Sequence, residues 1–271
     1  MSQPRKQRGD TSSAHYGRDT YGSRATALGG TALIMCVDRI VEKAKKLAAH
    51  LLGAKAKDVV FRDGKFFIKG KPKKSIGWSV LAQEAYVAKN IPVNFEPGLE
   101  ASAFFEPKNC TFPFGTHIVA VEIDRDTGEV KILKYVAVDD CGHQINPLLV
   151  EGQVQGGIAH SLGQVLFERA VYDDHGQLIT GEFMDYPLAR AKDIPEYVLD
   201  STVTPSPSNP MGIKGVGEAG TIGATPAIAN AVMDALSPLG IRRLDLPLLP
   251  EKIWRAIQEK TGKSKKQGRK S

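Results

Sequence analysis

The residue with the clearest chemical potential is Glu218, in the stretch MGIKGVGEAGTIG that spans residues 211–223. This stretch holds five glycines in thirteen positions, and Glu218 is its only carboxylate. Glycine lets a backbone approach a ligand closely, because it has no side chain to keep the two apart. A carboxylate among such small residues is predicted to be partly buried and aimed into a pocket, where it could act as a general base. The alternative is an ordinary solvated loop carboxylate.

Two other stretches hold polar groups that could bind a ligand. Gln153 and Gln155 lie in the glycine-rich segment GQVQGGIAHSLG, and each amide can donate and accept hydrogen bonds at once. Gln153 could recognise a heterocyclic ligand for which the glycines clear space, or the segment could be a close helix crossing with surface glutamines. In residues 20–30, backbone amides together with Ser23 and Arg24 could bind an anion such as a phosphate. A plain polar loop before a helix is the alternative there.

GVGEAG also matches the dinucleotide-binding pattern G-x-G-x-x-G at Gly215, Gly217 and Gly220. That pattern requires a buried strand before it and a helix that opens inside it. Prolines in the preceding residues TPSPSNPMGIK are incompatible with a central strand, and the next helix is expected only after Thr225. Glu218 would also repel a pyrophosphate, so the sequence disfavours a Rossmann fold.

The elements that must position these residues alternate between helices and hairpins. The Asp63-Gly64 pair predicts a tight turn between two short strands, and residues 117–140 predict a longer antiparallel hairpin. Residues 90–115 contain four prolines and predict an extended connection. The pattern indicates an α+β fold. Helices are expected at 31–52, 75–89, 147–167 and 227–236, with a short last one from Pro250.

Composition excludes several classes of protein. The net charge of +6 comes largely from Lys and Arg at the two ends and around residues 69–74, without interleaved aromatic residues. We therefore predict a basic segment at 1–8 and a disordered basic tail at 261–271, and no nucleic-acid partner. The three cysteines form no CxxC pair, so their spacing indicates neither a zinc site nor an iron–sulfur cluster. No apolar run is long enough to span a membrane, and a cytoplasmic protein is expected.

Several separated motifs together resemble one known family. GDT with YGSR, then DCGHQINP, EGQVQGG, KGVGEAG and ATPAIANAV follow one another in the order found in that family. The sequence is similar to the molybdopterin-binding large subunit of the xanthine dehydrogenase, aldehyde oxidase and aerobic carbon monoxide dehydrogenase family. The resemblance covers about residues 9–258 and corresponds to the C-terminal half of that subunit. We expect one molybdopterin-binding domain over 9–260, with a subdivision near 95–115.

The resemblance implies a molybdenum–molybdopterin cofactor, in its cytosine dinucleotide form, held through the pterin dithiolene and not by metal-ligating side chains. Glu218 matches the base beside the molybdenum. Gln153 matches a glutamine that hydrogen-bonds the pterin, and Gly22, Ser23 and Arg24 match a loop that contacts the cofactor. Lys214 and Gly217 flank the base as in the family's pattern. The implied reaction is oxidation of a carbon centre, in an aldehyde, carbon monoxide or an N-heterocycle, with oxygen derived from water.

The resemblance also implies partners. Electrons would pass to a 2Fe-2S small subunit and a medium subunit that carries FAD, and the family's upstream half would come from a separate chain. The segment MSQPRKQR stands where the family has an apolar strand, which leaves a second interpretation open. On that interpretation the chain is a truncated, non-catalytic remnant or binding module that keeps the fold without cofactor.

Overall fold

A computed structural model describes residues 20–267 and the isolated positions 10, 12 and 17. The predicted basic segment 1–8 lies outside these residues. The chain divides into two compact units, one comprising Met1–Thr20 and Leu28–Lys108, the other Tyr21–Ala27 and Asn109–Ser271. This division falls between residues 108 and 109, inside the interval 95–115 where the sequence suggests a subdivision. Each unit has its own hydrophobic core.

The first unit is built on helix α1, Thr31–Leu52, which has the bounds that its apolar spacing predicts. A π-helical turn, η1 (Thr26–Gly30), precedes it, and Gly53 ends it in the left-handed conformation. Its buried stripe packs against a small sheet and against helix α2, Trp78–Val87, which is shorter than the predicted 75–89. No helix or strand occurs from residue 88 to 113, as the four prolines predict.

The sheet of the first unit has three antiparallel strands, β1 (Val59–Arg62), β2 (Lys65–Ile68) and β3 (Lys71–Gly77), and follows the short helix η2 (Ala56–Asp58). Asp63 and Gly64 connect β1 to β2 with φ of 50° and 71°, the two positive values that a type I′ turn requires. The predicted hairpin is therefore confirmed. The third strand was not expected, because Pro72 and exposed lysines obscure it; proline is tolerated there since β3 is an edge strand.

The second unit contains a mixed sheet in the order β4 (Phe114–Ile123), β5 (Val130–Asp140), β6 (Tyr197–Thr202). The pair β4 and β5 is the predicted antiparallel hairpin, and the sequence signal for it was strict alternation on both sides of a turn. Strand β6 pairs with β5 in parallel, which the sequence did not indicate. The α+β fold class is confirmed.

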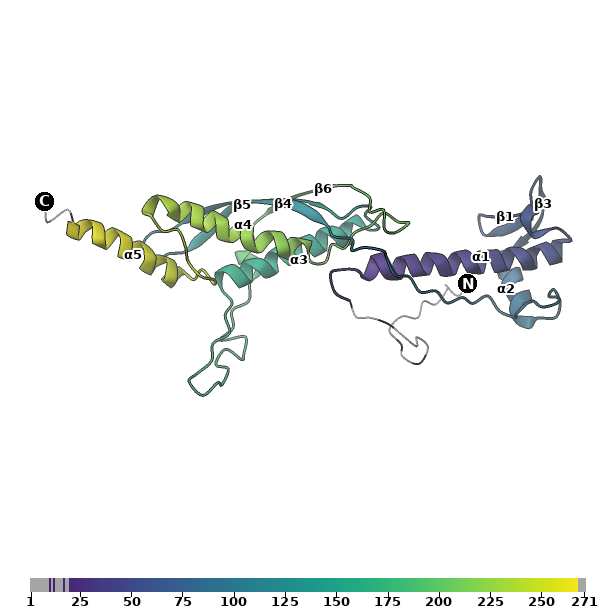
Figure 1. Cartoon of the computed structure of the whole chain (residues 1–271), viewed down its shortest axis with the longest axis horizontal. Coiled ribbons are helices and arrows are strands. Elements are labelled where there is room, and N and C mark those ends of the chain that lie inside the picture. The colour runs from purple at the N-terminus through teal and green to yellow at the C-terminus, as the bar shows by residue number, and fades with distance from the viewer. Residues whose placement is uncertain (1–9, 11, 13–16, 18–19, 268–271) are drawn as a thin grey trace. The chain divides into compact units, whose positions relative to one another are not determined.

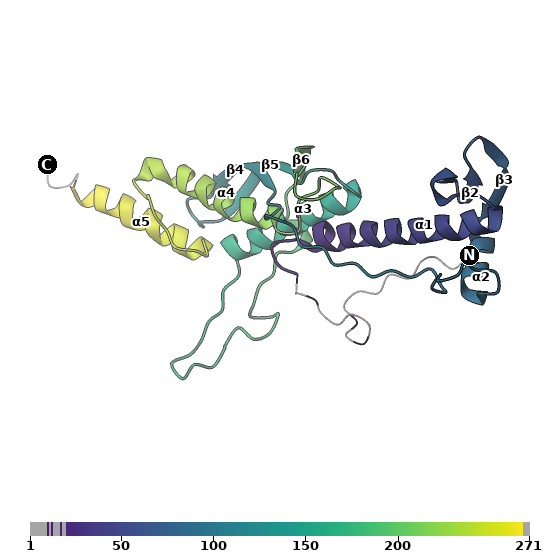
Figure 2. The same ribbon diagram turned by 45° about the vertical axis from the view of Figure 1, so that its right-hand side comes forward.

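Helices α3 (Pro147–Leu166) and α4 (Ala219–Leu236) run side by side and cover one face of this sheet (Figure 1; Figure 2). Asn146 caps α3 as predicted, accepting a hydrogen bond from the Leu149 N–H at 3.4 Å. The predicted close approach of another backbone occurs at Gly157: a Cβ there would lie 2.7 Å from the Thr221 nitrogen. The core between helices and sheet is apolar. Its fully buried side chains include Tyr135, Ile158, Leu162, Val165, Ile228, Val232, Leu236, Leu248 and Ile253.

The start of α4 corrects the expected helix at 227–236. The helix begins at Ala219, and Pro226 lies inside it. Proline cannot donate the backbone hydrogen bond to the Ile222 carbonyl, but the turn is also held from α3, because the Ser161 hydroxyl donates to the Thr221 carbonyl at 3.1 Å. A helix therefore does open inside GVGEAG. The Rossmann fold is still absent, since the nearest strand before this motif in the described residues is β6, which ends at Thr202.

The last helix is longer than the short one expected. Helix α5 runs from Pro250 to Gln267, into the predicted basic tail, whose residues 268–271 lie outside the described part. Two short helices, η3 (Ala191–Asp193) and η4 (Ser237–Leu239), complete the unit. Residues 167–196, between α3 and β6, form a long loop that extends away from the helices (Figure 2). None of the described helices has both the length and the apolar character needed to cross a bilayer.

Candidate functional site

Glu218 occupies the residue directly before helix α4, and its side chain is oriented by one hydroxyl. The Ser23 Oγ donates a hydrogen bond to the Glu218 Oε2 at 2.8 Å, across 195 residues of sequence. The carboxylate does not cap its own helix. It is exposed, which corrects the expectation of burial. The physical reason is that glycine and alanine neighbours are too small to cover it.

Ser23 reaches Glu218 because the loop around it is sharply turned. Gly22 and Ser23 both have positive φ, 58° and 56°, and the Arg24 N–H donates to the Tyr21 carbonyl at 3.4 Å. Serine rarely adopts this left-handed conformation. A non-glycine residue held there is an observed strain that the surrounding contacts must stabilise, and such strain is concentrated at functional sites.

Arg24 is engaged inside this loop. Its Nη1 donates to the Tyr21 hydroxyl at 2.9 Å, and its guanidinium carbon lies 4.0 Å from the centre of the Tyr21 ring. Although Arg24 follows Ser23 in the sequence, its guanidinium contacts Tyr21. Gly22 has open space around it, since a Cβ there would meet nothing within 4 Å.

Gln153, from helix α3, is the third component. A Cβ on Gly217 would lie 3.2 Å from the Ser23 Oγ and 3.4 Å from the Gln153 Oε1. Gly215 lies even closer to the loop: a Cβ there would be 2.6 Å from the Ser23 carbonyl oxygen. The two glycines therefore let three distant segments meet at one point. Ser23, Gln153, Gly217 and Glu218 form what we call the Glu218 cluster.

Two residues considered from the sequence lie outside this cluster. Gln155 donates to the Glu151 Oε1 at 2.9 Å, one turn back on the same helix. His160 is exposed on α3. In the described part of the chain, no group of three His, Cys, Asp or Glu side chains is arranged to hold a metal ion.

The sequence did not reveal a buried ion pair between Asp140 and Lys214, a lysine that lies shortly before Glu218 in the chain. The Lys214 Nζ donates to the Asp140 Oδ1 at 2.9 Å, with both side chains almost fully buried. Burial alone would raise the pKa of Asp140, but hydrogen bonds from Lys214, Gly142 and Thr204 outweigh it and hold that pKa well below its ordinary range. Burial, followed by the Asp140 charge, raises the pKa of the neighbouring Cys141 thiol.

A second buried network lies on the inner face of the sheet. The His117 Nδ1 is 2.8 Å from the Tyr135 hydroxyl, and its Nε2 is 3.3 Å from the Asp139 Oδ2. His117 pairs with Ala137 in the β4–β5 register, so residues 135 and 139 are its diagonal neighbours on the same face. The register of the predicted hairpin was the signal that could have found this group. Burial, then Tyr197 and Asp139, raises the pKa of Tyr135.

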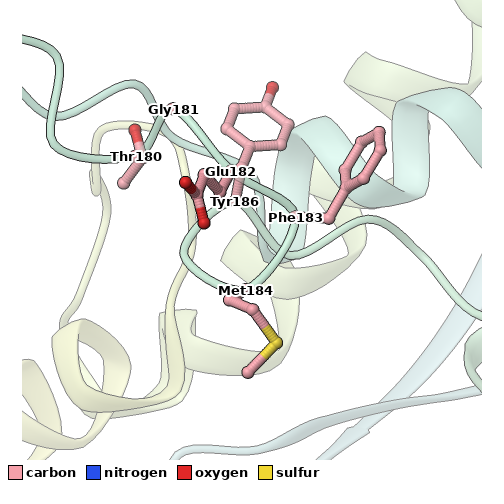
Figure 3. A pocket seen from close by; sticks show the side chains of 6 residues that line it. All are labelled: Thr180, Gly181, Glu182, Phe183, Met184 and Tyr186. Atoms are coloured by element: carbon pink, nitrogen blue, oxygen red, sulfur yellow. The ribbon is translucent and has the colours of Figure 1, made fainter.

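A hollow of this unit lies elsewhere, on the long loop between α3 and β6. A cavity of about 480 Å³ is lined by Thr180, Gly181, Glu182, Phe183, Met184 and Tyr186 (Figure 3). Phe183 and Met184 point to different sides of the loop in this view. No predicted site residue lines this cavity.

Comparison with known proteins assigns the chain to a family. The family described as "Molybdopterin cofactor-binding domain" matches residues 2–195. The chain belongs to this family. This molybdopterin-binding domain is 39% identical over 251 residues to the carbon monoxide dehydrogenase large chain of Hydrogenophaga pseudoflava, covering 93% of this chain and 31% of that one. It is 37% identical to the nicotine 6-hydroxylase large subunit of Paenarthrobacter nicotinovorans, over 92% of this chain and 31% of the relative.

A solved structure shows the same fold. The crystal structure of quinoline 2-oxidoreductase from Pseudomonas putida 86 superposes with a TM-score of 0.81 at 40% identity, over 90% of this chain and 31% of that one. The molybdopterin-binding domain therefore has the architecture of molybdenum hydroxylase large subunits and spans less than a third of the length of these relatives. The family match covers Ser23 and Gln153 and ends before Glu218, whereas the match to the carbon monoxide dehydrogenase large chain covers 93% of this chain.

Proposed function

We propose that this domain forms part of the active site of a molybdenum hydroxylase and that Glu218 is its general base. The observation that carries the proposal is the convergence of Ser23, Gln153 and Gly217 on Glu218, from three separate segments, in a member of the molybdopterin-binding family. An ordinary solvated carboxylate would need neither a strained serine loop nor two glycines packed against that loop.

The Glu218 cluster fits a pterin chemically. A pterin edge presents both donors and acceptors; the exposed Gln153 amide can donate and accept, and the half-buried Ser23 hydroxyl, which donates its hydrogen to Glu218, can still accept. The absence of a side chain at Gly217 leaves space between Ser23 and Gln153, which a Cβ at this position would occupy. We assign Gln153, Ser23 and the backbone around Gly22 and Gly217 to cofactor binding, with the cytosine dinucleotide form as the cofactor. When bound, this molybdenum–pterin group would supply the two-electron redox chemistry.

The role of the protein is then to hold and move one proton. Ser23 fixes the Glu218 Oε2, and among the described residues no donor engages the Oε1. That oxygen is free to accept a proton from water-derived oxygen as this oxygen attacks the substrate carbon. Exclusion of water would have to come from groups that cover the carboxylate in the assembled enzyme, because it is exposed on this chain.

The substrate proposed is a small molecule with an electrophilic carbon: carbon monoxide, an aldehyde or an N-heterocycle. The relatives act, by their names, on carbon monoxide and nicotine, and the structural match is an oxidoreductase of quinoline. Arg24 and Gly22 are assigned to the cofactor loop by position alone.

We further propose that the rest of the large subunit covers apolar surface that this domain exposes. On the outer face of the mixed sheet, Ile118 and Val198 flank Val136 across the strands and are 63% and 52% exposed. On the long loop, Phe183 and Met184 are 82% and 90% exposed. Exposed apolar surface of this kind marks contact sites. Iron–sulfur and FAD subunits would then take up the electrons, in the cytoplasm.

The test is the substitution Glu218→Gln in the assembled protein. The domain is co-expressed with the Hydrogenophaga pseudoflava large chain from which the matched segment is deleted. Molybdenum content should stay at the wild-type level, and dye reduction with carbon monoxide, aldehydes and N-heterocycles should fall by roughly a hundredfold or more. Glu259→Gln, on the exposed face of α5, is the control and should leave both unchanged. Full activity of Glu218→Gln would overturn the proposal.

The second candidate is a remnant that keeps the fold without cofactor, and the exposure of Glu218 favours it. Metal and pterin analysis separates the two functions. The enzyme requires molybdenum in the co-expressed assembly, whereas the remnant contains none, either alone or with the partner.

A further inference from the structure

The segment before Glu218 is fastened to the end of strand β5 by main-chain contacts. The Lys214 N–H donates to the Cys141 carbonyl at 2.7 Å, and Gly142 forms an isolated bridge with Ile213. The Asn209 side chain bonds both the N–H and the carbonyl of Ile213, at 3.2 and 2.9 Å. The backbone at 213–214 is thus fixed from two sides.

The Asp140–Lys214 ion pair lies at this junction. The side chains are 0% and 8% exposed, and Nζ and Oδ1 are 2.9 Å apart. Asp140 also accepts from the Gly142 N–H at 2.9 Å and from the Thr202 hydroxyl at 3.0 Å, so both its oxygens are engaged. A buried ion pair is seldom retained for stability alone, because desolvation of the charges offsets most of their attraction.

The Lys214 ammonium is not placed to bind a ligand. It is nearly inaccessible, bonds Asp140, and lies 4.3 Å above the centre of the Phe114 ring. The Lys214 side chain therefore contacts only the protein interior, and it can influence the Glu218 cluster only through the backbone of residues 214–218.

The backbone leads directly to the Glu218 cluster. The next residue, Gly215, donates to the Thr111 carbonyl at 3.3 Å and packs against the Ser23 main chain, where a Cβ would lie 2.6 Å from the carbonyl oxygen. Three residues later comes Glu218, bonded to the Ser23 hydroxyl. A shift of Lys214 would be passed to both partners of that hydrogen bond.

We propose that the Asp140–Lys214 pair is a positioning device that fixes residues 213–218 and thereby aims the Glu218 carboxylate. The expected effect of the ion pair on turnover rests on the proposed function of Glu218. Its expected effect on the rigidity of the backbone at 213–215 does not depend on that function. Asp140 and Lys214 are positioning residues and touch neither cofactor nor substrate.

The first measurement is amide hydrogen exchange on the full 271-residue chain without cofactor. In Lys214→Met, the amides of 213–215, which bond Asn209, Cys141 and Thr111, should exchange at least tenfold faster, while those of 228–236 in α4 stay unchanged. The double variant Asp140→Asn with Lys214→Met removes both charges, so it keeps the test valid if the single variant does not fold. The control is Lys134→Met, at an exposed lysine on β5, the strand that ends at Asp140; it should leave the exchange rates of 213–215 unchanged.

Unchanged exchange at 213–215 in a folded variant overturns the proposal, whatever Glu218 does. The second measurement is made on the co-expressed assembly. Molybdenum content and KM should be retained while kcat falls at least tenfold, and the loss should persist across the pH range. Faster exchange with unchanged kcat in an active assembly would contradict the claim that the pair aims Glu218, and the activity of Glu218→Gln decides separately whether Glu218 is the base.

Discussion

The orientation of Glu218 depends on a single hydroxyl group. Its own helix offers no restraint, since the carboxylate makes no capping hydrogen bond, and its glycine and alanine neighbours cannot restrain it by packing. Ser23 must therefore hold the Oε2, and the unusual left-handed backbone of Ser23 is what brings the hydroxyl there. The strained backbone of Ser23 is therefore what allows its hydroxyl to orient the Glu218 carboxylate.

Removal of that hydroxyl tests the arrangement. In Ser23→Ala, a hydrogen bond to a charged group is lost, which is worth about 1.5–3 kcal/mol, and turnover of the assembled enzyme should fall on the order of ten- to a hundredfold. Turnover is expressed per molybdenum atom, measured on the same sample, because Ser23 is also assigned to cofactor binding. Ser75→Ala, exposed on β3, is the matched control. Equal activity of both variants would show that Ser23 does not orient the base.

Asp140 should make stability depend on pH. Its pKa in the folded chain is depressed, because the bonds from Lys214 and its other donors outweigh burial. Between the ordinary carboxyl pKa of about 4 and the depressed value, the unfolded chain binds a proton that the folded chain does not, so stability falls as pH falls through that range. Above about pH 4 the contribution is fully present.

The measurement is the urea midpoint of wild type and Asp140→Asn at a series of pH values. The wild-type advantage should be constant from pH 7 to about 5 and shrink progressively below about 4. A constant difference down to pH 2.5 would contradict the depressed pKa.

At this scale the sequence singles out residues that the fold brings together, but it does not predict their surroundings. Glu218, Gln153 and Ser23 stand out by type and by glycine context, and the fold brings them together. The exposure of Glu218 was not predictable, because burial depends on what lies across space from it. Asp140 and Lys214 are 74 residues apart, and no spacing rule connects them.

At the scale of elements, the crossing of α3 and α4 is made possible by glycine. A Cβ on Gly157 would lie 2.7 Å from the Thr221 nitrogen, and one on Gly220 would lie 2.4 Å from the Val154 carbonyl oxygen. The Thr221 hydroxyl also donates to the Gly157 carbonyl at 3.0 Å. This close packing fixes the N-terminus of α4, where Glu218 lies, against the turn of α3 that carries Gln153.

Two adjacent glycines allow a matched experiment. Gly157→Ala forces a methyl group into backbone and should destabilise the chain by about 1–3 kcal/mol. Gly156→Ala places its methyl in open space and should stabilise the chain by about 0.5–1 kcal/mol, the ordinary gain in a helix. Urea unfolding of the two variants should therefore give midpoints on opposite sides of wild type. Midpoints shifted the same way would contradict the crossing.

The same crossing explains an element that the sequence misplaces. Thr225-Pro226 is typical of a helix start, yet α4 begins at Ala219. Contacts with α3 override this local signal, since the Ser161 hydroxyl bonds the Thr221 carbonyl and the Thr225 hydroxyl bonds Ser161. Elements whose apolar spacing or turn residues are unambiguous, such as α1 and the β1–β2 hairpin, have the predicted bounds because no tertiary contact opposes them.

At the scale of the whole molecule, the second unit completes a core on one face of its sheet and leaves the other bare. Val136 on β5 pairs with Ile118 on β4 and with Val198 on β6, which gives an apolar row across three strands. The helices α3 and α4 cover only the opposite face. A row of this kind on a chain that spans 31% of its relatives is expected to be buried by the remainder of the large subunit.

The last prediction is that a charge in this row blocks assembly without unfolding the domain. Ile118→Lys should leave the thermal midpoint of the 271-residue chain within a few degrees of wild type, because the side chain is 63% exposed. Co-purification with the complementary part of the Hydrogenophaga pseudoflava large chain, and with it molybdenum content, should be lost, since a buried unpaired charge is costly.

Gln258→Lys makes the same change of charge on the exposed face of α5 and should assemble normally. If Ile118→Lys assembles as well as Gln258→Lys, the outer face of the sheet is not the contact surface. In that case the same test is applied to the long loop, as Phe183→Lys, because Phe183 and Met184 are 82% and 90% exposed.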